Sequence, residues 1–132
     1  MKTIHTSGKR KRAIARVVLT PGIGIVKINN LMLDYYEPEL ARLKIMEPLQ
    51  LGEKFANKVN ISVTINGGGQ ISQADAARLA ISKALVEFSK SSTLKEIFLK
   101  YDRHMLIADT RRKEPAKPND SKARAKRQKS YR

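Results

Sequence analysis

The chain of 132 residues contains no cysteine, has two histidines and lacks any long apolar run. Without cysteine it can form neither a disulfide framework nor a thiolate metal site, and this composition fits a reducing cytoplasm. No stretch approaches the roughly 18 consecutive apolar residues of a membrane-spanning helix, and residues 1–5 lack the apolar run of a signal peptide. The sequence therefore predicts a cytoplasmic protein without disulfides or a membrane span.

Sequence motifs of common enzyme classes are also absent. His5 and His104 belong to no HExxH motif or Cys/His cluster, and there is no GxSxG elbow. Residues 67–69 are three glycines, but the Gly-Lys-Ser/Thr of a Walker loop does not follow them. Two interpretations of these glycines stay open: a tight strand-to-helix turn, or a turn where an RNA phosphate approaches the helix start. The sequence predicts no enzyme, no cofactor and no metal site.

What the chain does have is an excess of positive charge at both ends. Residues 1–16 carry six Lys and Arg and no acid, and residues 110–132 carry ten against two acids. Residues 17–109 hold eleven bases and ten acids. A nearly neutral middle between two cationic ends is typical of a protein that binds a polyanion, and a pI near 10.3 favours nucleic acid. A membrane surface is disfavoured because the ends offer no amphipathic helix with an apolar face.

The first part of the chain has the pattern of β-strands. A short strand around residues 3–7 and a turn at 8–11 precede apolar runs at 13–19 and 23–28. Thr20-Pro21-Gly22 separates the two runs, so they are predicted to form a hairpin.

A helical segment and a further strand follow. Residues 40–51 are predicted to be helical in two pieces, because Pro38 and Pro48 both suit the first turn of a helix. Residues 59–66 alternate between apolar and polar side chains, which predicts a half-buried strand. Its apolar positions are expected to face the core: Val59, Ile61, Val63 and Ile65.

A longer helix is predicted after the glycine run. Ser72 and Asp75 have the spacing of a capping box at its start. Arg78, Lys83 and Glu87 are expected on its exposed side. Apolar residues at helical spacing are expected to face the sheet: Ala77, Ala80, Ile81, Ala84, Leu85 and Phe88.

A second short helix is expected at about residues 93–101, and the apolar pattern ends after Asp109. This order of elements predicts an α+β fold rather than a doubly wound one. Residues 1–109 are expected to form one globular RNA-binding domain. Residues 110–132 have too few apolar side chains for a core and are expected to form an extended basic arm.

The basic segments hold the candidate RNA-binding side chains. Lys9, Arg10, Lys11 and Arg12 are four consecutive cations on a predicted turn, with no acid nearby. Arginines of the arm can bind phosphates in a bidentate manner, and Tyr131 can stack on a base or sugar. A flexible cationic arm suits folded RNA, in whose channels it can become ordered.

Several motifs carry a resemblance to a known family. They are GKRKRAIARV at residues 8–17, the glycines at 67–69 with QADAAR at 73–78, and a C-terminal series. That series comprises DR at 102–103, RRKEP at 111–115, KP at 117–118, AR at 123–124 and QKSYR at 128–132. In this order, over nearly the whole chain, they resemble small-subunit ribosomal protein nine, in its archaeal and eukaryotic branch.

The resemblance implies a two-layer α+β domain with helices on one face of a mixed sheet and a left-handed βαβ crossover, an unusual hand. It implies a structural protein in the head of the small ribosomal subunit, bound to ribosomal RNA and neighbouring head proteins. It also implies an arm that reaches tRNA in the peptidyl site. The expected rRNA-binding residues are Lys9, Arg10, Lys11, Arg12, Arg16, Arg103, Arg111, Arg112, Lys113, Lys117, Lys122, Arg124, Lys126, Arg127 and Gln128. The expected tRNA contacts are Lys129, Ser130, Tyr131 and Arg132.

The chain departs from the family pattern at two places. Ser72 stands where the family usually has glycine, which suggests a side-chain cap and argues against RNA contact there. Asn119 and Asp120 stand where glycines are usual, and both residue types tolerate turns. Two other classes were weighed: a free nucleic-acid chaperone or DNA packer, which would not need Gln, Ser and Tyr at a fixed end, and an enzyme, which the missing catalytic motifs disfavour.

Overall fold

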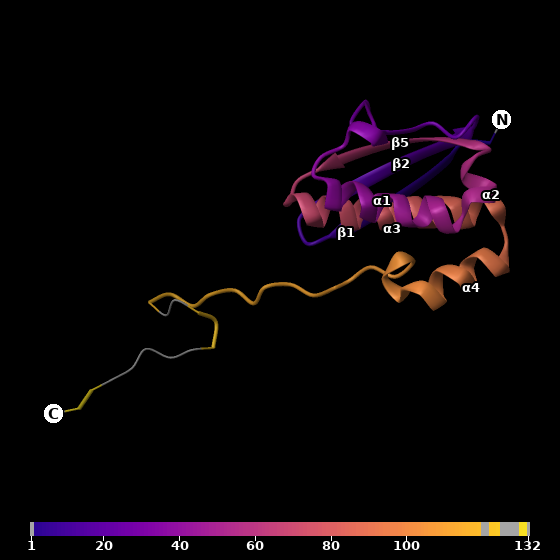
Figure 1. The fold of residues 1–132 in the computed structure, drawn as a ribbon. Helices are drawn as coiled ribbons and strands as arrows, with labels where there is room; N and C mark the ends of the chain where they lie inside the picture. Colours follow the sequence, from indigo (N-terminus) through magenta and orange to yellow (C-terminus); the bar gives the residue numbers. More distant parts are fainter. Residues whose placement is uncertain (1, 120–121, 125–129, 132) are drawn as a thin grey trace.

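The computed structural model describes residues 2–119, 122–124 and 130–131 (Figure 1). It has an α+β fold in which a five-stranded mixed sheet packs against helices. The strands are β1 (Ile4–Arg10), β2 (Ala13–Pro21), β3 (Val26–Ile28), β4 (Leu31–Met32) and β5 (Val59–Asn66). The helices are η1 (Leu33–Tyr35), α1 (Glu39–Leu51), α2 (Glu53–Ala56), α3 (Gln70–Ser89), α4 (Ser92–Tyr101) and η2 (Arg103–Met105).

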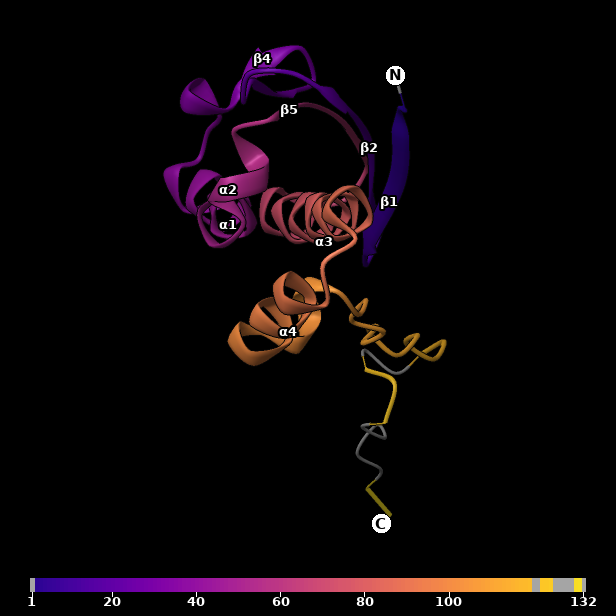
Figure 2. The same cartoon turned by 90° about the vertical axis from the view of Figure 1, so that its right-hand side faces the viewer.

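The strands lie in the order β1-β2-β5-β3-β4. Among the strand pairs of the described residues, β3–β5 alone is parallel. Figures 1 and 2 show α1 and α3 against one face of the sheet, which curves around α3. Helix α4 lies on the side of α3 that faces away from the sheet, so the helices form two tiers rather than one layer.

The core lies between the sheet and α3, and the alternation predicted for β5 is confirmed. Val59, Ile61, Val63 and Ile65 are all buried. The small side chains of α3 allow a close approach to the sheet. At Gly8 of β1, an added Cβ would lie only 2.9 Å from a backbone nitrogen of α3. The helix predicted at about 93–101 is confirmed as α4.

The predicted hairpin between residues 13–19 and 23–28 is wrong, because β5 lies between β2 and β3. The backbone after β2 bonds to the start of β5 instead. Gly22 N–H donates to the Lys58 carbonyl, and the Asn60 side chain accepts from the N–H groups of Ile23 and Ile25. The true hairpin is β1–β2, with its turn at Lys11 and Arg12.

Helix α1 is also one continuous helix rather than two pieces. Pro38 is its N-cap residue, one position before the first turn in which the sequence placed it, and Pro48 lies inside the helix. Proline there removes one backbone donor, at a cost to the helix. Ala41, Ile45 and Pro48 form one buried face, so packing against the core offsets that cost.

Burial ends near the point where the apolar pattern ends. Met105 is the last buried side chain among the residues that the structure describes. From 110 onward, the described residues contain no helix or strand. None of the described helices is both long and apolar enough to cross a membrane.

Candidate nucleic-acid interface

The β1–β2 turn presents cations beside the glycine turn. Lys9, Lys11 and Arg12 are exposed, and Lys11 has a positive φ of 52°. The following glycines fit against this turn. Gly68 also has a positive φ, 72°, and an added Cβ there would lie 2.8 Å from the nitrogen of Ala13. Glycine is therefore required by both backbone conformation and space.

The start of α3 differs from the expectation. The helix begins at Gln70 with Gly69 as its N-cap and no side-chain cap, so the predicted capping box at Ser72 is wrong. Asp75 instead pairs with Lys44 of α1, with 2.9 Å between Oδ1 and Nζ. No side chain caps the first turn, so its N–H groups lack a side-chain acceptor at the positive end of the helix dipole, and residues 69–71 are exposed there. The argument against RNA contact at Ser72 therefore does not hold.

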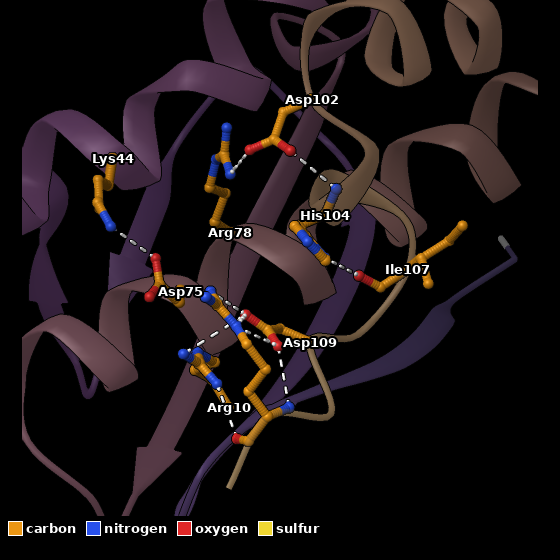
Figure 3. Close-up of polar contacts among 9 residues, drawn as sticks. Arg10, Lys44, Asp75, Arg78, Asp102, His104, Ile107 and Asp109 are labelled. Carbon is orange, nitrogen blue, oxygen red and sulfur yellow. Dashed lines mark hydrogen bonds and ion pairs between the residues drawn. The ribbon is translucent and has the colours of Figure 1, made fainter.

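Asp109 fastens the beginning of the arm to the β1–β2 turn (Figure 3). Arg111 Nη2 donates to Asp109 Oδ2 at 2.7 Å, and Arg111 Nε donates to both carboxylate oxygens. Arg10 lies 3.4 Å from the same carboxylate and donates to the Arg111 carbonyl at 3.2 Å. The hydrogen bonds from Arg111, with the charge of Arg10, hold the pKa of Asp109 well below its usual range. The arm therefore leaves the body beside the basic turn.

These three segments together line an open hollow of about 780 Å³. No carboxylate of the described residues lines it. Arg10 is mainly engaged with Asp109, so the free cationic groups come from the turn and the next residues of the arm. The lining residues are Arg10, Lys11, Arg12, Gly68, Gly69, Ser72, Arg111, Arg112 and Lys113.

The sequence predicted Arg78 on the exposed side of α3, and this prediction is wrong. Its side chain is 11% exposed and pairs with Glu47 of α1 and with Asp102 after α4. Burial raises the pKa of Asp102, but hydrogen bonds from Arg78 and from the His104 N–H bring it below its ordinary value. His104 Nδ1 lies 3.3 Å from the Ile107 carbonyl (Figure 3). These contacts join α1, α3 and η2, so the position of Arg78 is structural.

Other predicted site residues are spread over the molecule. Arg16 is exposed in β2, where Ser7 of β1 and Thr64 of β5 are its cross-strand neighbours. Arg103 is exposed in η2. Exposed positions in the arm are Lys117, Lys122, Arg124, Ser130 and Tyr131. Predicted contacts at Lys126, Arg127, Gln128, Lys129 and Arg132 lie outside the described residues.

Two features of the arm concern residues expected to bind RNA: an ion pair of Arg124 and the backbone conformation of Asn119. Arg124 Nε donates to Glu114 Oε2 at 2.8 Å, although both side chains are largely exposed. An exposed pair of this kind contributes little to stability and leaves Arg124 free to exchange partners. Asn119 has a φ of 64°, which confirms that this residue tolerates the turn where the family has glycine. Asp120 lies outside the described residues.

Asp109 is the residue of this site that the sequence analysis missed. An aspartate followed two residues later by arginine permits the Asx-type bond from the Arg111 N–H, at 3.0 Å. That local signal was present in the sequence. The contact with Arg10, 99 residues away along the chain, was not visible in it.

Comparison with known proteins agrees with the resemblance. A family model described as ribosomal protein S9/S16 matches residues 8–132. The small ribosomal subunit protein uS9 of Methanococcus vannielii is 48% identical over 134 aligned positions, covering all of both chains. The protein of the same name from Desulfurococcus amylolyticus is 50% identical over 132 positions, covering all of this chain and 94% of its own. The chain therefore belongs to the ribosomal protein S9/S16 family, as a non-enzymatic structural component of the small ribosomal subunit.

Proposed function

We propose that this chain binds ribosomal RNA in the head of the small subunit through the basic hollow. The arm, residues 110–132, then extends toward tRNA in the peptidyl site, and residues 1–109 form the body that anchors it. The first part rests on one observation: three segments converge on a hollow that is lined by no carboxylate among residues 2–119, 122–124 and 130–131. The turn, the glycines and the arm are far apart in sequence, yet all three line it.

The chemistry of the hollow suits a phosphate backbone. Lys11 and Lys113 supply point charges, whereas Arg12 and Arg112 supply planar donors for bidentate phosphate contacts. The outward N–H groups at the start of α3 add a fixed positive potential beside them. Such contacts position RNA without reading its sequence. Arg10 takes a different part, because its contacts with Asp109 hold the arm in place.

The tRNA part of the proposal depends on the family motif at residues 128–132. Of these, Ser130 and Tyr131 are described, and Tyr131 is 88% exposed. An exposed tyrosine ring near a chain end can stack on a base or sugar. The described arm residues from 111 to 119 are all exposed, so a partner outside the chain has to order them.

The family resemblance also leads us to infer a left-handed crossover between β3 and β5. The parallel pairing of these strands, with α1 and α2 between them in the chain, is the arrangement to which that handedness applies.

The test compares two variants that lose the same charge. Lys11→Ala with Arg12→Ala removes two cations from the hollow. Lys54→Ala with Lys58→Ala removes two exposed cations from the region of α2. Binding of a head-domain rRNA fragment is measured over a salt series, and the first variant should flatten the slope by roughly two units. Equal slopes for the two variants would show that the hollow does not bind the RNA.

A further inference from the structure

The sheet edge opposite β1 leads into a segment with exposed apolar side chains. Strand β4 forms that edge, and the chain continues through η1 into α1. Leu31 is 46% exposed, Tyr35 71%, Leu40 61% and Leu43 50%. These four side chains are called the apolar edge below. Large exposed apolar side chains gathered in one short segment mark protein interaction sites.

One side chain joins the parts of this segment. Arg42 Nη1 donates to the Asp34 carbonyl at 2.9 Å, and Arg42 Nη2 lies 3.9 Å from Glu39 Oε1. Helix η1 is therefore held beside the first turns of α1. Leu40 and Leu43 are one helical turn apart, so they are surface neighbours. Figure 2 shows β4 and α1 on the side of the fold away from β1.

The charge of this segment is opposite to that of the chain before it. Asp34, Glu37 and Glu39 are exposed, and no Lys or Arg occurs between Lys27 and Arg42. Residues 2–33, in contrast, contain seven cations and no carboxylate. Carboxylates repel phosphates, so RNA is a poor partner for the apolar edge.

We propose that the apolar edge docks a segment rich in Lys and Arg from a neighbouring protein of the small subunit. The aliphatic stems of such side chains pack on leucine and tyrosine while their charged ends reach the nearby carboxylates. A guanidinium can also stack on Tyr35. This partner assignment rests on the proposed function, because it requires the chain to be assembled in the particle.

A photo-cross-linking amino acid at Tyr35 in assembled small subunits tests this docking. Tyr35 should cross-link to a protein, and mass spectrometry should identify a peptide with net positive charge. The same amino acid at Lys11 should cross-link to RNA. The docking inference is overturned if Tyr35 links to RNA, to an uncharged or acidic peptide, or to nothing while Lys11 still links to RNA. The proposed function is unaffected by these three outcomes. Absence of RNA linkage from Lys11 contradicts the proposed function instead.

A charge reversal tests the role of the carboxylates. Glu37→Lys with Glu39→Lys should lower the yield of the Tyr35–protein cross-link at least fivefold and leave the Lys11–RNA cross-link unchanged. The matched control is Glu87→Lys with Glu96→Lys, which reverses two exposed carboxylates on α3 and α4. A Tyr35 yield that the first pair leaves unchanged, or that both pairs lower equally, shows that these carboxylates do not select the partner.

Discussion

The surfaces beside the two edges of the sheet, β1 and β4, differ in charge and in polarity. Beside β1 and β2, cations of the turn and the arm surround a hollow, and no carboxylate lines it in the part of the chain that the structure describes. Beyond β4, three carboxylates accompany exposed leucine and tyrosine side chains. A net charge of +15 conceals this division. The comparison indicates that one small fold presents one surface suited to a polyanion and another suited to a basic protein.

Removal of the arm should produce the largest difference between the two surfaces. Deleting residues 110–132 takes away ten of the 27 Lys and Arg residues. Affinity for an rRNA fragment should fall by about 100-fold at moderate salt, because several phosphate contacts are lost together. The body should stay folded, since Met105 is the last buried side chain in the part of the chain that the structure describes. Fluorescence binding and thermal unfolding measure the two effects.

The matched change at the apolar edge is Glu37→Lys with Glu39→Lys. It should keep RNA affinity within about twofold of that of the unmodified protein, because these residues lie away from the hollow. A truncated protein that still binds within threefold of the full chain would show that the arm contributes little to binding. An unfolded truncated protein would show that the body depends on the arm.

The glycine turn allows a sharper comparison between adjacent residues. Gly68→Ala should destabilise the fold by about 1–3 kcal/mol, because a side chain is strained at its positive φ and the new Cβ meets Ala13. Gly69 has a negative φ and nothing within 4 Å of an added Cβ. Gly69→Ala is therefore the control and should change Tm little. Calorimetry measures the Tm of both variants. Equal Tm values would contradict the close packing of Gly68 against Ala13.

The end of the arm is expected to contribute a smaller effect. Deleting residues 129–132 should leave subunit assembly nearly intact and weaken tRNA binding in the peptidyl site by about tenfold or less. The rest of the chain retains most of the rRNA-directed charge, and tRNA has many other contacts. The rate of tRNA dissociation from particles with the truncated protein is the measurement. Failed assembly with an unchanged rate would identify these residues as an rRNA anchor.

The smallest effect is expected for Asp109→Asn, which keeps the shape of the side chain but removes its charge. RNA affinity should fall about two- to threefold, because a neutral amide holds Arg10 and Arg111 less firmly. Amide exchange at Arg111, whose N–H donates to Asp109 Oδ1, should increase. Thr110→Ser, at an exposed neighbouring position, is the control. Unchanged exchange in Asp109→Asn would show that the carboxylate does not hold the arm.

The same contact predicts a pH dependence. The pKa of Asp109 is lowered in the folded protein. Its pairing therefore contributes full stability at pH values above the ordinary aspartate pKa of about 3.9, and this contribution is lost progressively as the pH falls from there toward the lowered pKa. The protection of the Arg111 N–H should therefore decline below about pH 4 in the unmodified protein and show no such decline in Asp109→Asn.

Local patterns in the sequence were sufficient to predict several elements. The alternation of apolar and polar side chains in residues 59–66 predicted β5 and its buried face. Every second side chain of a strand points to the same face, so the pattern shows which face is buried whatever packs against it. The charged ends and the terminal motif indicated RNA and the family. Loss of apolar residues after Asp109 predicted where burial ends, since a segment without apolar surface cannot offset its ordering entropy.

The pairing of strands and the meeting of charges, in contrast, depend on contacts between distant parts of the chain. The Pro-Gly turn after β2 resembled a hairpin, but its backbone donors bond to β5, a strand 38 residues further along. Pro48 continues a helix because its buried face offsets the lost bond. Arg78 turns inward because Glu47 and Asp102 from other elements neutralise it, and Asp109 meets Arg10 across the fold. In each case a partner distant in sequence supplies the free energy, and local propensity carries no information about that partner.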